Sequence, residues 1–264
     1  MSTLCARSPV TLVTGGAGGI GAGIVEVLQA AGHEVVIVDL PAVDVASAVD
    51  VDLVVDATLA DFGRIDGLVN NAAIGPLGTI VDTDEATWDD IVGVNLKGPF
   101  LMSRAVVPHM VAAGGGSIVN IGSGAGHGKA NMAAYAASKG GLFALGASMA
   151  YDHFHQRIRV NTVVPGGGGI PTGISLGRFG GSADDYARLP HPGSVAGRPV
   201  LPADVGAAVA FLLSDAAAAV TGTVLDVGAM ANQGGPMPLS ADSDLSRLSD
   251  PDPAPDDHPD DGEE

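Results

Sequence analysis

Residues 11–25, TLVTGGAGGIGAGIV, contain two overlapping glycine motifs. The register G-x-G-x-x-G uses Gly16, Gly18 and Gly21. The register T-G-x-x-x-G-x-G uses Thr14, Gly15, Gly19 and Gly21. In both registers the turn follows an apolar run and opens a stretch with helical spacing, so that backbone N–H groups at a helix N-terminus can approach a pyrophosphate. The stretch therefore predicts the strand–turn–helix unit of a dinucleotide-binding domain.

A second apolar run, HEVVIVD, ends in Asp39, which lies 18 positions after Gly21. A carboxylate near this spacing accepts hydrogen bonds from the ribose of an adenosine group. The same carboxylate would repel a 2′-phosphate, and no Arg or Lys occurs at positions 15–17 or at Leu40 to bind one. The sequence therefore predicts NAD as the cofactor in preference to NADP.

Short apolar runs alternate with helical stretches along most of the chain. Further apolar runs end in turn signals at 67–73, 116–123, 158–166 and 223–228, and helical spacing occurs at 46–62, 87–112, 132–155 and 202–214. This alternation is typical of a parallel sheet that is covered by helices on both faces. We therefore expect an α/β fold with a doubly wound parallel sheet, the Rossmann fold, of about seven strands in a single domain over residues 1–238.

The composition is that of a protein with one substantial core. The chain has 264 residues, of which 46% are hydrophobic and 16% charged. No apolar run approaches the ~18 residues that span a bilayer, and the first ten residues lack the apolar block of a secretory signal. The single cysteine, Cys5, has no partner for a disulfide or a metal site. We expect a cytoplasmic protein that binds no membrane, no metal and, without a cluster of basic residues, no nucleic acid.

Two segments differ in composition from the rest. Residues 239–264 contain ten acidic residues and one arginine, a net charge of −9 out of −18 for the whole chain. Such a segment buries too little apolar surface to fold, and we expect an acidic disordered tail. Residues 166–199 are rich in Gly and Pro and begin at the carboxyl end of a predicted strand. We expect them to form a lid over the substrate.

The sequence YAASK places Tyr135 and Lys139 one turn apart on one face of a predicted helix. An isolated tyrosine, with a pKa of about 10, is a poor base at neutral pH. A cation about 4 Å away contributes roughly 4 kcal/mol at an effective dielectric constant near 20, enough to lower the pKa of the phenol toward neutrality. Ser123 lies twelve positions before Tyr135, at the end of a predicted strand, where it can hydrogen-bond a substrate oxygen, and Asn95 lies within an apolar helix. Taken singly, the first pair is more often a surface pair and Asn95 a hydrogen-bonded core amide.

Together, these motifs resemble those of the short-chain dehydrogenase/reductase family. The resemblance rests on TGGAGGIG, VVIVD, NNAA, VNLKG, IVNIGS, YAASK and RVNTVVPG, and it extends over residues 10–228. It implies that the T-G-x-x-x-G-x-G register is the one in use. It also implies an enzyme that interconverts a small-molecule secondary alcohol and a ketone with NAD, and a homo-oligomer, either a dimer or a tetramer.

The resemblance implies a role for each matching residue. Tyr135 would be the general acid/base, Lys139 would lower its pKa and bind the ribose hydroxyls, and Ser123 would orient the substrate oxygen. Asn95 would hold a water molecule that relays protons. The cofactor-binding residues implied in this way, beside Tyr135 and Lys139, are Thr14, Gly15, Gly19, Ile20, Gly21, Asp39, Asp44, Val45, Asn71, Ala72, Pro165, Gly166, Ile170 and Thr172.

One departure from the family follows Asp39. Only four residues separate it from Asp44 and Val45, and the distance onward from Asp44 fits the family's third strand and the helix behind it. The helix that usually joins the second and third strands is therefore expected to be missing. We predict that Asp44 and Val45 flank the adenine at an unusually open rim of the cofactor site.

The predicted lid carries a mixture of aromatic, aliphatic and basic side chains: Phe179, Tyr186, Leu189, Arg178 and Arg188. This mixture indicates no dedicated clamp for a phosphate or coenzyme A. Two alternatives to an alcohol dehydrogenase stay open. One is an enoyl reductase or epimerase of the same family, and the other is a non-catalytic NAD-binding scaffold or regulator that uses the acidic tail.

Overall fold

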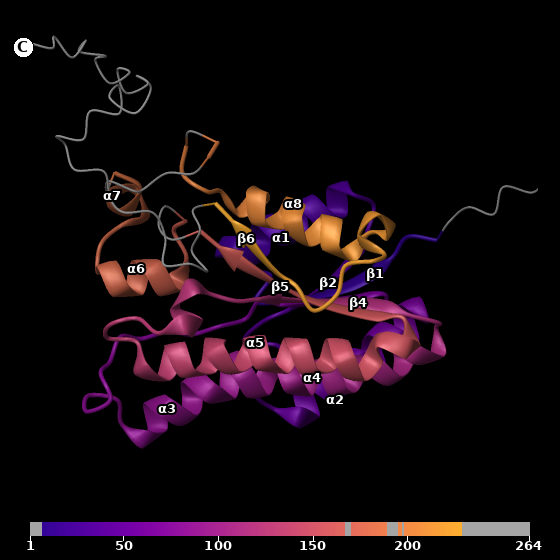
Figure 1. Ribbon diagram of the computed structural model, residues 1–264, viewed down its shortest axis with the longest axis horizontal. Helices are drawn as coiled ribbons and strands as arrows, with labels where there is room; N and C mark the ends of the chain where they lie inside the picture. The colour runs from indigo at the N-terminus through magenta and orange to yellow at the C-terminus, as the bar shows by residue number, and fades with distance from the viewer. Residues whose placement is uncertain (1–6, 167–169, 189–194, 197, 229–264) are drawn as a thin grey trace, which may run out of the picture.

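The structure, a computed structural model, describes residues 7–166, 170–188, 195–196 and 198–228. The predicted acidic tail, Cys5 and Leu189 lie outside these described residues. A central sheet is covered by helices on both faces (Figure 1). The predicted doubly wound α/β architecture is confirmed.

The sheet is parallel, with the strand order β2-β1-β3-β4-β5-β6. Its strands are β1 (Val10–Thr14), β2 (Glu34–Val38), β3 (Gly67–Asn70), β4 (Gly116–Ile121), β5 (Ile158–Pro165) and β6 (Val224–Val227). The prediction of about seven strands is one too high for the described residues, which form six. The strand order reverses between β1 and β3, and in such sheets ligands bind beyond the carboxyl ends of the strands at this point.

Each face of the sheet carries its own hydrophobic core. Helices α1 (Gly19–Ala30) and α8 (Pro202–Leu213) pack together on one face, and α2 (Ala48–Phe62), α4 (Gly98–Ala112) and α5 (Ala133–His153) cover the other (Figure 1). Successive strand residues point to opposite faces. Leu12 accordingly packs in the core beneath α2, α4 and α5, whereas Val13 packs in the core beneath α1 and α8.

The helix predicted at 87–112 has three parts that follow one another directly. These are α3 (Glu85–Val92), a π-helical turn (Gly93–Lys97) and α4. Asn95 lies in the π-helical turn and is fully buried. Such turns are rare in helices and often occur at functional sites.

The segment between Asp39 and α2 is a short series of turns. Val43 N–H donates to the Asp39 carbonyl over 3.0 Å, and Ser47 N–H donates to the Asp44 carbonyl over 3.0 Å. No helix lies between Asp39 and Asp44, so the predicted absence of the joining helix is confirmed. The third strand that the resemblance implies from Asp44 onward is not formed, because the backbone makes these turns instead, and β2 is the edge of the sheet among the described residues.

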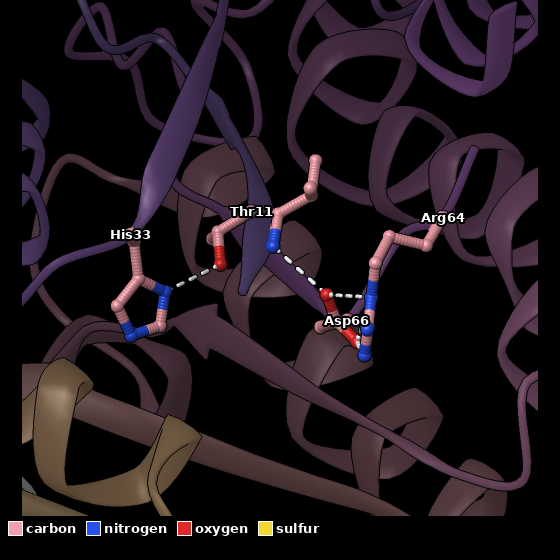
Figure 2. A network of polar contacts seen from close by, with 5 residues as sticks. Thr11, His33, Arg64 and Asp66 are labelled. Carbon is pink, nitrogen blue, oxygen red and sulfur yellow. Dashed lines mark hydrogen bonds and ion pairs between the residues drawn. The ribbon is translucent and has the colours of Figure 1, made fainter. Parts of the chain in front are cut away.

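A polar network joins the amino ends of β1, β2 and β3 (Figure 2). Asp66 accepts the Val10 N–H over 2.8 Å and the Arg64 Nε–H over 2.8 Å. The hydroxyl of Thr11 lies 2.9 Å from Nδ1 of His33, just before β2. These contacts align the strands at the end of the sheet opposite their carboxyl ends.

Candidate active site

A cleft of about 1090 Å³ lies beyond the carboxyl ends of the strands. Residues that follow β1, β2, β3, β4 and β5 line it, together with α6 (Gly173–Phe179) of the predicted lid. Most of the predicted site residues line this one cleft: Gly15, Gly19, Ile20, Asp39, Asn71, Ala72, Ser123, Tyr135, Lys139, Pro165, Gly166, Ile170 and Thr172. Five predicted site residues do not line it: Thr14, Gly21, Asp44, Val45 and Asn95. Of these, Asp44 and Val45 line a smaller cavity.

The geometry of the glycine loop distinguishes between its two registers. Gly15 and Gly19 have φ angles of +63° and +53°, which L side chains rarely adopt. A Cβ on Gly21 would lie only 1.9 Å from the Gly15 carbonyl oxygen. By contrast, Gly18 has an extended backbone with φ −155° and no atom within 4 Å of a Cβ position. The T-G-x-x-x-G-x-G register therefore contains the glycines that this turn requires.

Thr14 and Asn71 hold the glycine loop against the segment that follows β3. The Thr14 hydroxyl accepts the N–H groups of Asn71 and Ala72 over 2.9 and 3.0 Å. The Asn71 amide donates to the carbonyls of Thr14 and Gly15 over 3.0 and 2.9 Å. Thr14 is buried and, like Gly21, does not line the cleft. Both residues therefore shape the glycine loop and do not contact a ligand in the cleft.

Asp39 directs its carboxylate toward the glycine loop. One oxygen accepts the Ala17 N–H over 2.9 Å, and the other accepts the Leu40 N–H over 2.9 Å. The side chain also lines the cleft. Asp39 therefore lies where a group bound along the loop would meet it.

Asp44 and Val45 line a separate cavity of about 140 Å³ rather than the main cleft. This cavity adjoins the cleft, because Gly15, Asp39 and Ala72 line both. The Asp44 carboxylate accepts the Ala46 N–H over 2.8 Å. The structure thus brings both residues to the edge of the site, next to Asp39.

Tyr135 and Ser123 meet on the other side of the cleft. Tyr135 lies in the first turn of α5, is 8% exposed, and its hydroxyl is hydrogen-bonded to that of Ser123. Burial raises the pKa of Tyr135 because it penalises the phenolate, while the Ser123 hydrogen bond and the charge of Arg178 act in the opposite direction. The expectation of a pKa below the ordinary value is wrong for this geometry, since burial outweighs the two opposing effects.

Lys139 lies one turn along α5 and is 3% exposed. Its Nζ donates to the Ile121 carbonyl over 2.8 Å and lies 5.9 Å from the centre of the Tyr135 ring. Burial lowers the pKa of Lys139 to about 8. The ammonium is therefore fixed beneath the cleft with N–H groups left over for a further acceptor, since it has three.

Asn95 braces the backbone that follows β3. Its Oδ1 accepts the Ile74 N–H over 2.9 Å, and its Nδ2 donates to the Ile74 carbonyl over 2.8 Å and to the Ser138 hydroxyl over 3.1 Å. Ser138 in turn donates to the Tyr135 carbonyl over 2.8 Å. Both amide hydrogens are used in these contacts, so the Asn95 side chain positions Ile74 and α5, and it does not line the cleft.

The described residues of the predicted lid form two short helices, α6 and α7 (Ala183–Ala187). Thr172 caps α6, because its hydroxyl accepts the Ser175 N–H over 3.1 Å. A Cβ on Gly19 would lie 3.3 Å from the Thr172 side chain, so the start of α6 packs close against the glycine loop.

Arg178 of α6 is a cleft residue that the sequence interpretation treated only as part of the lid surface. Its Cζ lies 4.8 Å from the centre of the Tyr135 ring, and its Nε donates to the Gly75 carbonyl over 2.7 Å. The only sequence signal was an arginine within the lid. Its contact with Gly75 spans 103 positions in the chain and depends on how the lid folds.

The glycine-loop end of the cleft fits a dinucleotide. A helix has unpaired N–H groups at its N-terminus, and α1 begins at Gly19, beside the open backbone of Gly18. Asp39 lies at the end of the neighbouring strand as a hydrogen-bond acceptor. Anion-binding N–H groups and a carboxylate for a ribose are thus present in one place.

Two absences hold for the part of the chain that the structure describes. No helix in this part of the chain combines the length and apolar character needed to cross a bilayer. Likewise, no group of three or more His, Cys, Asp or Glu residues in it is arranged to hold a metal ion.

Comparison with known proteins agrees with this geometry. A family model described as enoyl-(acyl carrier protein) reductase matches residues 40–229. The chain is 35% identical over 244 residues to 2-(S)-hydroxypropyl-CoM dehydrogenase 3 of Xanthobacter autotrophicus, covering 84% of this chain and 95% of that protein. It is 36% identical over 247 residues to D-threitol dehydrogenase of Mycolicibacterium smegmatis, covering 83% and 92%.

A solved structure is similar over the same region. The 3-ketoacyl-(acyl-carrier-protein) reductase from Brucella melitensis, complexed with NADH, superimposes with a TM-score of 0.74 at 30% identity, covering 86% of this chain and 99% of that one. The chain therefore belongs to the short-chain dehydrogenase/reductase family and is an oxidoreductase.

Proposed function

We propose that the protein is an NAD(H)-dependent dehydrogenase that interconverts a secondary alcohol and a ketone. The observation that carries this proposal is the meeting of Ser123, Tyr135 and Lys139 in the same cleft as the glycine loop and Asp39. The similar dehydrogenases named above act, by their names, on hydroxylated small molecules. Asp39, with no cation near it on the loop, supports NAD rather than NADP.

The chemistry that a bound dinucleotide would supply is hydride transfer between its nicotinamide and the carbinol carbon of the substrate. Gly15, Gly19 and Ile20 would hold its phosphates, Asp39 its adenosine ribose, and Asp44 and Val45 would lie near its adenine. Pro165, Gly166, Ile170 and Thr172 would lie at the nicotinamide end of the cleft.

The protein's own residues handle the proton. In oxidation, the Tyr135 phenolate takes the hydroxyl proton of the alcohol, and in reduction the phenol returns it to the ketone oxygen. Ser123, hydrogen-bonded to Tyr135, would orient that oxygen. Lys139 would bind the ribose near the nicotinamide, while the Ser123 hydrogen bond and the charge of Arg178 favour the phenolate. Asn95 would act indirectly, because it is hydrogen-bonded to Ile74 and to α5, and residues of both line the cleft.

The enoyl reductase alternative has the description of the matching family model in its favour. It predicts turnover of an α,β-unsaturated thioester, with reduction of the carbon–carbon double bond, in place of turnover of a secondary alcohol. The non-catalytic alternative predicts NADH binding without turnover of any substrate.

The deciding experiment compares Tyr135→Phe with the wild-type protein. We expect the variant to lose turnover of secondary alcohols by about 10²–10⁴-fold, because the general acid/base is removed. Its NADH affinity, measured by quenching of nucleotide fluorescence, should change little. Equal turnover by both proteins would refute the assigned chemistry, and NADH binding by a wild-type protein that turns over no alcohol, ketone or enoyl thioester would favour the scaffold.

A family-like homo-oligomer, either a dimer or a tetramer, is a further part of the proposal. It is tested by light scattering on the eluate of a size-exclusion column. A mass of one chain, 26.1 kDa, across a range of concentrations would refute it.

A further inference from the structure

The substrate side of the cleft carries charge of one sign. Among the described residues that line the cleft, Lys129, Lys139 and Arg178 are basic, and Asp39 is the only acidic one. Asp39 lies at the glycine-loop end, where it accepts the Ala17 N–H. The whole chain, in contrast, has a formal net charge of −18. A positive pocket in an acidic protein indicates selection for a negatively charged ligand.

Arg178 lies closer to the centre of the Tyr135 ring than Lys139 does. Its guanidinium carbon lies 4.8 Å from the centre of the Tyr135 ring. A Cβ on Gly75 would lie 2.6 Å from Nη2 of Arg178 and 2.9 Å from Cδ2 of Tyr135, so the lack of a side chain at Gly75 makes room for this arrangement. The guanidinium is thus wedged between the backbone of Gly75 and the ring of Tyr135.

The hydrogen bonds of Arg178 leave much of its guanidinium without an acceptor. Nε donates to the Gly75 carbonyl over 2.7 Å, whereas Nη2 is buried and has no acceptor among the described residues. No carboxylate in that part of the chain forms an ion pair with it. Removing a cation from water without a counter-charge is unfavourable, and accordingly burial lowers the pKa of Arg178.

Arg188, another arginine of the predicted lid, has an ordinary surface environment. It lies at the end of α7, its side chain is 75% exposed, and it pairs with Asp185 over 3.2 Å. Arg178 has neither this exposure nor such a partner. The difference indicates that a bound ligand supplies the negatively charged partner of Arg178.

We propose that the substrate is a hydroxy acid, or the corresponding keto acid, and that Arg178 binds its carboxylate beside Tyr135. The proposal rests on the proposed function, because it places the acid group relative to a secondary alcohol held at Tyr135. Among the described residues the guanidinium has a single protein acceptor, the Gly75 carbonyl, so charged N–H groups are left for a ligand carboxylate. Since the guanidinium lies on the Tyr135 ring, the carboxylate belongs within a few bonds of the reacting carbon, as in a 2- or 3-hydroxy acid.

The test uses matched pairs of substrates that differ only in charge. We would measure kcat/KM for 2- and 3-hydroxy acids and for their methyl esters, with the wild-type protein, Arg178→Gln, Arg178→Lys and the control Arg188→Gln. The wild type and Arg188→Gln should prefer each acid to its ester. Arg178→Gln should lower the acid-to-ester ratio by about 10- to 100-fold, mainly through KM, because a charged hydrogen bond is lost. Arg178→Lys should restore part of the preference.

A wild-type protein with a higher kcat/KM for the esters than for the acids would overturn the inference. An Arg178→Gln variant in which kcat/KM falls equally for the acid and the ester of each pair would also overturn it. In either outcome, turnover of the hydroxy acids or of their esters would still support the proposed dehydrogenase function. If no alcohol is turned over, the proposed function fails, and the anion site is judged by binding alone. Propionate should then raise the melting temperature of the NADH-loaded wild type more than propionamide does, and this difference should vanish in Arg178→Gln. Equal shifts for both compounds in the wild type would overturn the site itself.

Discussion

Arg178 lies closer to the Tyr135 ring than Lys139 does. Its guanidinium carbon is 4.8 Å from the ring centre, whereas Nζ of Lys139 is 5.9 Å away and donates to the Ile121 carbonyl. The charge of Arg178 opposes the effect of burial, which raises the pKa of Tyr135. The proton affinity of the phenol therefore depends on a residue of the predicted lid as well as on burial and on Ser123.

This relationship predicts opposite pH dependences for the two directions of the reaction. Oxidation needs the phenolate of Tyr135 and should become faster as the pH rises above neutrality, whereas reduction needs the phenol and should become slower. Arg178→Gln removes a charge that lowers the pKa of Tyr135, so both profiles should move to higher pH. Initial rates in both directions, measured across a series of overlapping buffers, check this. Profiles that move to lower pH would contradict the electrostatic role of Arg178.

Two glycines of the same loop should respond differently to alanine. Gly21→Ala places a Cβ 1.9 Å from the Gly15 carbonyl oxygen, and we expect a loss of about 3 kcal/mol in the free energy of unfolding, together with weakened NADH binding. Gly18→Ala meets no atom within 4 Å and should cost less than about 1 kcal/mol. Urea unfolding of both variants measures the difference. Equal stabilities would show that the loop relaxes around the new methyl group.

The carboxylate of Asp39 should set the choice of dinucleotide. The wild type is expected to bind NADH more tightly than NADPH, because a 2′-phosphate would lie beside a negative charge. Asp39→Ser removes this repulsion, and the NADPH-to-NADH affinity ratio should rise by about 10- to 100-fold. Glu34→Ser, an exposed acid at the other end of β2, is the matched control and should leave the ratio unchanged. A wild-type preference for NADPH would contradict the assignment.

The network at the amino ends of the strands predicts a pH-dependent stability. Burial lowers the pKa of His33 from its ordinary 6.5, and the charge of Asp66 only partly opposes this. Below pH 6.5 the unfolded chain therefore binds a proton that the folded protein binds less readily, so stability falls as the pH drops. The melting temperature should decrease from pH 7 to pH 5, and His33→Gln should show a smaller decrease over that interval. An equal slope in the variant would assign the effect to other groups.

Much of the cofactor side of the site follows from local sequence. The glycine turn is specified by sterics, since Gly15 and Gly19 have positive φ and Gly21 has no room for a side chain. The missing joining helix follows from chain length, because four residues between Asp39 and Asp44 are too few to form it. The strand number was harder to predict: the segment at Asp44 is long enough to extend, but its backbone groups form turns instead.

The substrate side depends more on tertiary contacts. The two helices of the predicted lid were not predicted, although Thr172 and Ser182 are residue types that commonly cap helices. In the structure each of these hydroxyls accepts the N–H three residues further along. The position of Arg178 depends on where those helices pack. The same holds for the pKa of Tyr135, because the sequence pair with Lys139 says nothing about how deeply the phenol is buried.

Among the described residues the sheet ends at β2, and a short series of turns follows it where the family resemblance implied a joining helix and a third strand. The purine of a bound dinucleotide would consequently face open water on that flank. Nucleotides enlarged on the purine ring, such as those tethered there to a resin or a fluorophore, should therefore be accepted with little loss of affinity, which would make this enzyme suitable for work with immobilised coenzyme.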